Sequence, residues 1–194
     1  FSDDMNTLSK DKNAAFEFCE AEYYMAFDKA TGKMVGRVAA IINHKANKKW
    51  ERNDVRFGWI DFVDDIEVTR ALLQAVEDYG REKGMKSIVG PLGFTDMDRE
   101  GMLVEGFDRR SCFFTYYNHP YYIDHMAALG YVKDVDWIEE LITVPTDEKT
   151  IQRWEKLSDF VLKRNHLHIV EPKSRLAYLP LLKPFFDLVN VAYA

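Results

Sequence analysis

The hydrophobic positions near the start of the chain have the composition of β-strands. Residues 22–27 are aromatic and strand-like, and residues 34–42 form a second run rich in valine, isoleucine and alanine. Between them, residues 28–33 are typical of a turn, with Gly32 available for a positive φ. The pattern therefore predicts a β-hairpin.

A second strand composition returns at residues 56–63, after a basic stretch without apolar periodicity at residues 43–56. We expect that basic stretch to be a loop. Strict two-residue alternation in the strand would place Phe57, Trp59 and Asp61 on one face. The other face would then hold Gly58, Ile60 and Phe62.

The clearest helix is predicted at residues 66–83, where apolar side chains recur at three- and four-residue spacing. Asp64 or Asp65 would cap its start and Gly84 would end it. Residues 85–91 follow as a short buried strand, and this strand–helix–strand order indicates a crossover between parallel strands.

The rest of the chain alternates between loop, helix and strand patterns. Taken together, the elements predict an α/β (α+β) fold with a mixed, mostly antiparallel sheet, a central parallel pair and helices on both faces. The remaining predicted elements are a glycine-rich acidic loop at 91–108, a short helix at 120–129, a long strand at 131–144, a helix at 148–164, a short strand at 168–170 and a helix at 173–193.

Composition and charge narrow the class of protein. The 194 residues carry a net charge of −6, the wrong sign for neutralising nucleic acid phosphates. No apolar run is long enough to cross a membrane and the start lacks the features of a signal peptide, so we expect no membrane association. Two cysteines in a chain of this length fit a reducing cytoplasm. We expect a cytoplasmic protein without nucleic acid partners.

The acidic loop is a candidate ligand site. It follows a buried parallel strand, and open α/β sheets bind ligands beyond the carboxyl ends of their strands. Asp96, Asp98 and Glu105 could line a pocket for an amine, or could simply cap turns. The same loop imitates the opening of a calcium loop, but Phe107 stands where that motif requires a bidentate glutamate, so we expect no metal.

Asp61 is a candidate general base. A charge on a central strand is costly unless it is exposed or paired. Asp61 therefore lies either at the edge of a site, where it could take a proton from an acceptor amine, or beside a basic residue.

Three stretches carry a resemblance to a known family: GKMVGRVAAII at residues 32–42, GPLGFTDMDREGMLVEGF at 90–107 and NHPYYIDHMAALGY at 118–131. Together with the order of elements, they resemble the GNAT superfamily of acyl-CoA N-acyltransferases over residues 21–144. The second stretch is also similar to uncharacterised bacterial proteins built from tandem modules of this kind.

The resemblance implies a splayed pair of parallel strands and a binding site for acetyl-CoA or another acyl-CoA. On the matching positions, the implied cofactor-binding residues are Phe62, Val63, Arg70 and Asn118. As catalytic residues we expect Asp61, Tyr122 and His125, although spacing does not distinguish Tyr122 from Tyr116, Tyr117 and Tyr121 as the source of a hydroxyl. Tyr117 would bind substrate with the loop carboxylates Asp96, Asp98 and Glu105.

Two departures from the family pattern leave a second hypothesis open. The family's glycine-containing pyrophosphate motif is absent at residues 62–70, which hold three carboxylates and no glycine. In addition, Met126 stands where the family often has a proton-donating tyrosine.

The first hypothesis is an acyl-CoA-dependent N-acyltransferase that transfers an acetyl group to a small-molecule amine, with a homodimer as a possible assembly. The alternative is a catalytically degenerate GNAT-fold module with a ligand-binding or structural role.

The expected organisation divides the chain into three parts. Residues 1–147 form a GNAT-like module lacking its first strand and helix, and residues 148–167 form a connecting helix. Residues 168–194 supply a strand and a helix that either begin a second module or complete the first.

Overall fold

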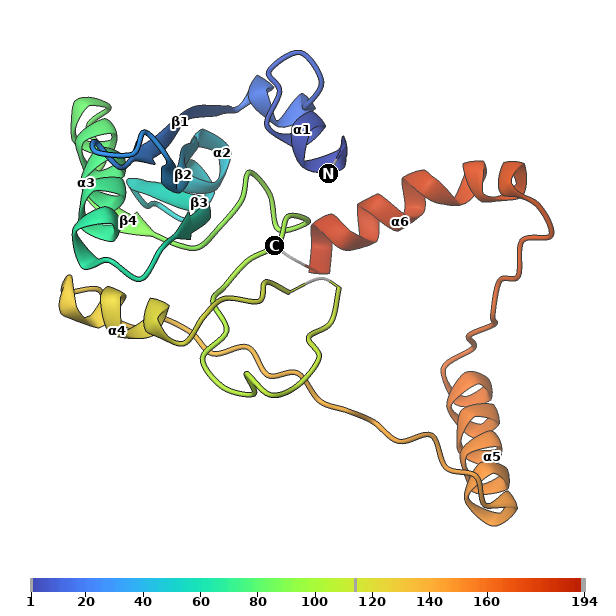
Figure 1. Ribbon diagram of the computed structural model, residues 1–194. Helices are drawn as coiled ribbons and strands as arrows, with labels where there is room; N and C mark the ends of the chain where they lie inside the picture. Colours follow the sequence, from blue (N-terminus) through green and yellow to red (C-terminus); the bar gives the residue numbers. More distant parts are fainter. Residues whose placement is uncertain (1, 114, 193–194) are drawn as a thin grey trace. The chain divides into compact units, whose positions relative to one another are not determined.

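The computed structural model describes residues 2–113 and 115–192 (Figure 1). The chain divides into two compact units, residues 1–138 and residues 139–194. Unit 1 contains a sheet with its covering helices, and unit 2 contains two further α-helices.

A four-stranded mixed sheet is the centre of unit 1. The strands are β1 (Cys19–Phe27), β2 (Met34–Asn43), β3 (Asp54–Phe62) and β4 (Ser87–Val89), arranged in that order. The first two neighbouring pairs are antiparallel, and β3 and β4 are parallel. The predicted hairpin, the parallel pair and the mixed α/β class are therefore confirmed.

Helix α3 (Ile66–Glu82) connects the two parallel strands, as predicted. Asp65 caps its start, and Gly84, with a φ of +77°, follows its end. The helix buries Leu72, Leu73 and Val76 against one face of the sheet, where they are at most 2% exposed. Burial of each such side chain contributes about 1.5–3 kcal/mol, so this helix is a main source of stability.

Helix α4 (Tyr121–Ala128) extends the same core. Pro120 precedes it and Gly130, with a φ of +86°, follows it, which agrees with the predicted short helix. Tyr122 and Met126 join the apolar cluster that α3 forms with β2 and β3. This packing places α4 beside the last residues of β3.

The other face of the sheet is covered by the loop after β4 and by the N-terminal segment. Phe94 is fully buried there and packs against Trp59 and Phe16. The loop passes so close that a Cβ on Gly58 would lie 2.4 Å from the carbonyl oxygen of Leu92. The N-terminal segment contains α1 (Ser2–Thr7) and the 3-10 helix η1 (Ala14–Glu17).

A β-bulge in β3 corrects the predicted faces of this strand. Val38 on β2 lies opposite both Trp59 and Ile60, and Trp59 has a φ of +46°. Phe57, Ile60 and Phe62 consequently share the α3 side of the sheet, whereas Trp59 packs on the other side. Two-residue alternation failed because a bulge adds one residue to one strand.

Three other predictions of local structure were wrong. The basic stretch contains a helix, α2 (His44–Lys49), because the Asn43 side chain accepts the N–H of Ala46 at 2.8 Å and caps it. Residues 131–144 and 168–170 are not strands. Tyr131 is held by an edge-on contact with Phe57 and by its hydroxyl, which donates to Glu77 at 3.0 Å.

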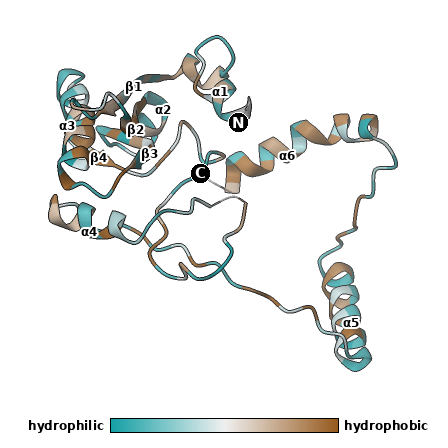
Figure 2. Ribbon diagram, viewed as in Figure 1, coloured by the Kyte–Doolittle hydropathy of each residue, from teal (hydrophilic) through white to brown (hydrophobic). Residues whose placement is uncertain are grey.

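Unit 2 contains the two predicted late helices, α5 (Glu148–Arg164) and α6 (Leu179–Ala192), with the 3-10 helix η2 (Arg175–Tyr178) before α6. The last predicted helical residue, Tyr193, lies outside the described residues. Both α-helices contain many hydrophobic positions (Figure 2). None of the described side chains of α5 and α6 is buried, and the exposed apolar ones include Trp154, Phe160, Phe185 and Phe186.

Candidate functional site

The end of β3 is where α4 meets the sheet, and two tyrosines fasten them together. The Tyr121 hydroxyl donates to the carbonyl of Phe62 at 2.7 Å. The N–H of Phe62 donates to the Tyr122 hydroxyl at 3.2 Å, and the Phe62 and Tyr122 rings stack with centroids 3.9 Å apart. Both polar backbone groups of Phe62 are therefore satisfied by α4.

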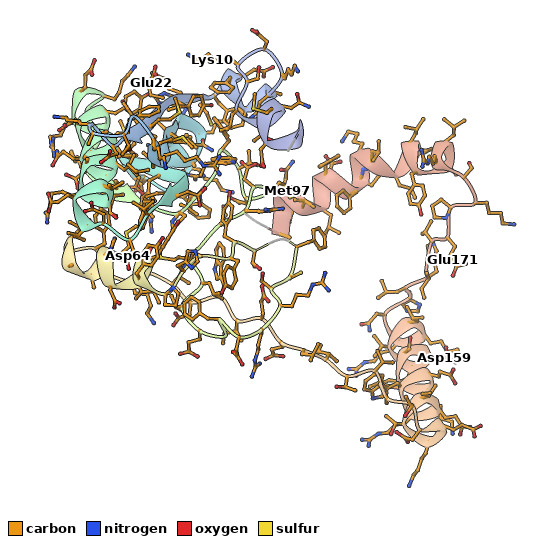
Figure 3. All side chains as sticks on the ribbon, in the orientation of Figure 1. Lys10, Glu22, Asp64, Met97, Asp159 and Glu171 are labelled. Carbon is orange, nitrogen blue, oxygen red and sulfur yellow. The ribbon has the colours of Figure 1, made fainter. Side chains whose placement is uncertain are left out.

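His125 fastens α4 to the start of α3. Its Nδ1 lies 2.7 Å from the Thr69 hydroxyl and its Nε2 lies 3.1 Å from a carboxylate oxygen of Asp64. The Thr69 hydroxyl also donates to the carbonyl of Asp65 at 3.4 Å, so hydrogen bonds link the ring to both ends of the first turn of α3. His125 is 8% exposed and Thr69 is fully buried, so the ring is held in place. Asp64, labelled in Figure 3, lies beside α4.

Asp61 forms an ion pair with a basic residue, which was one of the two expectations for it. Arg37 on the neighbouring strand places Nη2 2.6 Å and Nε 2.8 Å from one oxygen of Asp61. The Tyr122 hydroxyl lies 3.5 Å from the other oxygen. Burial raises the pKa of Tyr122 to about 12, so this hydroxyl stays protonated at neutral pH.

The start of α3 is occupied by its own carboxylates. Asp65 accepts the N–H of Glu67 at 2.9 Å, and Arg70 forms an ion pair with Glu67 at 3.4 Å. The N–H of Val63 donates to the carbonyl of Val35 at 3.0 Å. Three of the predicted cofactor-binding residues, Phe62, Val63 and Arg70, thus lie at this end of the sheet with their own partners.

Asn118, the fourth predicted cofactor residue, has a structural environment. It is 8% exposed, and its side chain accepts the N–H of Leu103 at 2.7 Å and donates to the carbonyl of the same residue at 3.1 Å. These two hydrogen bonds tie the long loop after β4 to the segment that leads into α4.

The predicted substrate residues are not gathered in one pocket. Asp98 accepts the N–H of Thr95 at 3.0 Å, which is the turn-capping alternative. Asp96, Glu105 and Tyr117 are exposed, and the Tyr117 hydroxyl donates to the carbonyl of Phe107 at 3.3 Å. Burial of the Asp98 carboxyl raises its pKa. This effect outweighs the backbone hydrogen bonds to the carboxyl, which lower the pKa.

Glu100, in the part of the acidic loop that imitates a calcium loop, is a titratable residue that was not among the predicted site residues. It is half-buried, and desolvation, followed by the negative charge of Asp96, raises the pKa of its carboxyl to about 7. Arg56 lies close enough to oppose this shift and donates from Nη1 to the carbonyl of Gly93 at 3.0 Å. The position of Glu100 in the acidic loop is evident from the sequence. The burial of Glu100 depends on how this loop folds back on the sheet, which the sequence does not show.

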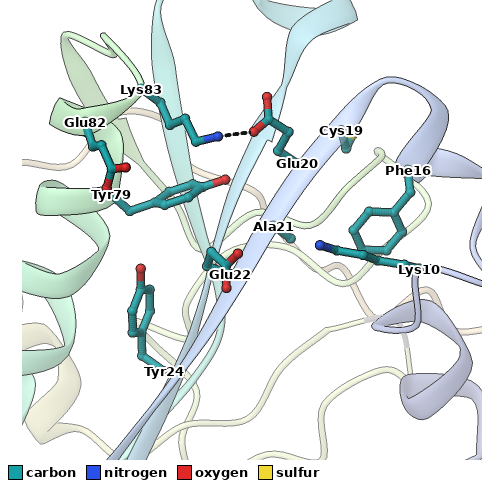
Figure 4. Close-up of a pocket in the computed structure, with 10 residues that line it drawn as sticks. All are labelled: Lys10, Phe16, Cys19, Glu20, Ala21, Glu22, Tyr24, Tyr79, Glu82 and Lys83. Atoms are coloured by element: carbon teal, nitrogen blue, oxygen red, sulfur yellow. Dashed lines mark hydrogen bonds and ion pairs between the residues drawn. The ribbon is translucent and has the colours of Figure 1, made fainter.

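A hollow of about 750 Å³ lies along the outer edge of β1, which β2 separates from β3 in the sheet (Figure 4). Its walls include Tyr79 from α3 and Phe16 from η1, and Lys83 donates to Glu20 across it at 2.5 Å. No predicted site residue lines it. We place the candidate site at the end of β3, because the polar side chains converge there.

Within residues 2–113 and 115–192, no helix is long and apolar enough to cross a bilayer. The part of the chain that the structure describes also holds no group of three or more histidine, cysteine, aspartate and glutamate side chains arranged to bind a metal ion.

Two curated proteins are similar to this chain in sequence. Protein YghO of Escherichia coli (strain K12) is 29% identical over 163 residues, which is 82% of this chain and 40% of that protein. The bacterial ceramide synthase of Caulobacter vibrioides (strain NA1000 / CB15N) is 30% identical over 137 residues, 70% of this chain and 35% of that protein. No family model matches the chain, and no solved structure matches it significantly.

The similarity covers the candidate site. A matched stretch of about 70% of a 194-residue chain includes residues 61–131 wherever it begins, and this holds for both relatives. Those residues contain Asp61, α3, the acidic loop and α4. The chain spans well under half the length of either relative.

Proposed function

We propose that this chain is part of an acyltransferase that joins an acyl group to an amine. The proposal is carried by the 30% identity to a bacterial ceramide synthase over a stretch that includes the end of β3 and α4. A ceramide is the amide of a fatty acid with a long-chain amino alcohol. By this analogy, the acceptor is a long-chain amine and the product is its amide.

Asp61 is the proposed proton acceptor. When an amine attacks the carbonyl carbon of an acyl thioester, the C–N bond forms, the C–S bond breaks and the thiolate leaves. The nitrogen must also lose a proton, and a carboxylate beside it can take that proton. The Asp61 side chain is 59% exposed, so an acceptor can reach it, and Arg37 holds it in place. Tyr122 and His125 are buried, and in this proposal they position α4 and the end of β3 rather than meet the substrate.

The family resemblance implies coenzyme A as the carrier of the acyl group, and the start of α3 does not fit it. Asp65 already accepts the N–H of Glu67, and Asp64, Asp65 and Glu67 would repel a pyrophosphate. The proposal therefore assigns no step of the reaction to a coenzyme A bound at this turn.

A second candidate function rests on the same capped turn. A module whose phosphate-binding groups are already satisfied could serve an acyltransferase by supporting another part of it. In that case Asp61 would be a surface residue, and its charge would not affect the rate.

The test is amide formation measured by mass spectrometry. The chain, or a longer protein that contains it, is incubated with sphinganine and palmitoyl-CoA at pH 7.5. The first candidate predicts that Asp61→Asn lowers the rate at least about a hundredfold, within the range of general-base effects. Asp78→Asn, which removes a carboxylate paired with Arg81 on α3, is the matched control. An unchanged rate in Asp61→Asn would favour the supporting role.

A further inference from the structure

We infer that α4 seals the end of β3 and the first turn of α3 into a closed junction, and that the phosphates of an acyl-CoA donor bind away from it. The junction consists of Phe62, Asp64, Asp65, Thr69, Tyr121, Tyr122 and His125. The inference rests on the proposed function only for the class of acyl donor.

Three amide groups at the start of α3, those of Glu67, Val68 and Thr69, already have hydrogen-bond acceptors. A helix N-terminus binds phosphate through backbone N–H groups that lack a partner within the helix. Here the Asp65 side chain accepts the N–H of Glu67 at 2.9 Å. The Asp65 carbonyl accepts the N–H groups of Val68 at 3.1 Å and Thr69 at 3.3 Å.

The charge at this turn has the wrong sign for a phosphate. Asp65 caps the helix and Glu67 lies in its first turn, so the favourable interaction with the positive end of the helix dipole is already made. Arg70, the nearest cation along the helix, forms an ion pair with Glu67. A phosphate would have to displace one carboxylate while remaining close to the others.

The backbone at the end of β3 is satisfied as well. The Tyr121 hydroxyl donates to the carbonyl of Phe62, and the Tyr122 hydroxyl accepts the N–H of Phe62. The carbonyl of Val35 accepts the N–H of Val63. An extended amide ligand pairing with this strand would first have to break these bonds.

The helix that makes these contacts is held at more than one point. His125 bridges Thr69 and Asp64, and the rings of Tyr122 and His125 both stack on Phe62, with centroids 3.9 and 5.5 Å away. Tyr122 is only 6% exposed. Removing α4 from the junction would expose its apolar side chains together with several unpaired polar groups, so we treat α4 as a fixed part of the unit.

The inference is tested by titrating coenzyme A into the chain at pH 7.5, using calorimetry and the backbone amide spectrum by NMR. We expect no saturable binding with a Kd below about 1 mM, and no shift of the Glu67, Val68 and Thr69 amides. Saturable binding that shifts these three amides overturns the inference. Binding that leaves them unshifted supports it, because the phosphates then lie elsewhere.

Two substitutions at the cap test the structural basis. Asparagine is as good a helix cap as aspartate, so Asp65→Asn removes the charge and keeps the cap, whereas Asp65→Ala removes both. Hydrogen exchange at the Glu67 amide should be about fivefold faster in Asp65→Ala than in the parent and nearly unchanged in Asp65→Asn. Equal exchange in all three proteins would contradict the capped turn. Asp78→Asn again serves as the control on the same helix.

The two measurements together distinguish a failure of this inference from a failure of the proposed function. Absent amide formation together with absent coenzyme A binding would reject the proposed function and leave the junction intact. Amide formation with first-turn amides that respond to coenzyme A would support the function and overturn the junction.

Discussion

His125 on α4 and Thr69 on α3 form a 2.7 Å hydrogen bond between two buried side chains that are 56 residues apart in the sequence. The other ring nitrogen, Nε2, lies 3.1 Å from a carboxylate oxygen of Asp64. The pair therefore fixes the position of α4 on α3, and with it the position of Tyr122 at the end of β3.

Removal of the imidazole should destabilise unit 1. We expect His125→Ala to lower the free energy of unfolding by about 2–4 kcal/mol, because it removes the shorter of the two hydrogen bonds of the Thr69 hydroxyl and opens a cavity. Urea denaturation followed by circular dichroism measures the loss. His119→Ala, at an exposed histidine just before the same helix, should change stability by about 0.5 kcal/mol or less. A loss below about 1 kcal/mol in His125→Ala would show that the ring contributes little.

The hydroxyl of Tyr122 should contribute through the backbone of Phe62. Tyr122→Phe keeps the stacked ring and removes the acceptor of the Phe62 N–H, so we expect a loss of about 1–2 kcal/mol. Tyr23→Phe removes a hydroxyl that donates to the carbonyl of Leu8 from an exposed ring, and should cost less. Equal losses in the two variants would contradict the buried role of Tyr122.

The close passage of the loop over β3 makes Gly58 hard to replace. A Cβ there would lie 2.4 Å from the Leu92 carbonyl oxygen, which belongs to the backbone and cannot turn aside. We expect Gly58→Ala to cost more than about 3 kcal/mol or to prevent folding. Gly32→Ala tests the opposite case, since that site is open and has only the strain of a φ of +67°, about 1–2 kcal/mol. Thermal melting of both proteins makes the comparison, and a smaller loss at Gly58 would refute it.

Glu100 should make stability fall as the pH rises. Burial raises the pKa of Glu100 from its ordinary value of 4.5 to about 7. Between these two pH values the folded state therefore holds a proton that the unfolded state has released. The contribution of Glu100 to the free energy of unfolding is therefore greatest below about pH 4.5, and it is lost as the pH rises to about 7. Solvent screening of a half-buried carboxyl limits the effect to about 1 kcal/mol. Urea unfolding at pH 5 and 7.5 should show this slope, and Glu100→Gln should reduce it; an identical slope in both proteins would rule out Glu100 as the cause.

The elements of the sheet and α3 could be predicted because local signals agree with tertiary packing there. The apolar spacing of residues 66–83, a carboxylate cap and a closing glycine all favour the same helix. The strand predicted at residues 131–144 failed although its apolar residues suit a strand. A strand requires a partner, and its apolar side chains such as Leu141 and Ile142 are 95% and 75% exposed.

The candidate site was predictable only as a collection of residues. Asp61 was predicted from its charge on a strand, and Tyr122 and His125 from their place on the late helix. The structure brings all three to one end of β3. Their partners could not be predicted. The hydrogen bond between His125 and Thr69 depends on how α4 packs against α3. The ion pair between Arg37 and Asp61 depends on the register of β2 and β3. Neither the packing nor the register can be predicted residue by residue from one sequence.

Because of the bulge, β3 has one more residue than β2 between two paired positions, and Trp59 is that extra residue. Without Trp59, Gly58 and Ile60 would still face opposite sides, so a chain one residue shorter could keep both faces of the sheet in place. What it would lose is the indole that packs on Phe94. When homologous chains are aligned, a one-residue gap is therefore tolerable at position 59, and such a gap would mark sequences that fill the second face of the sheet with some other side chain.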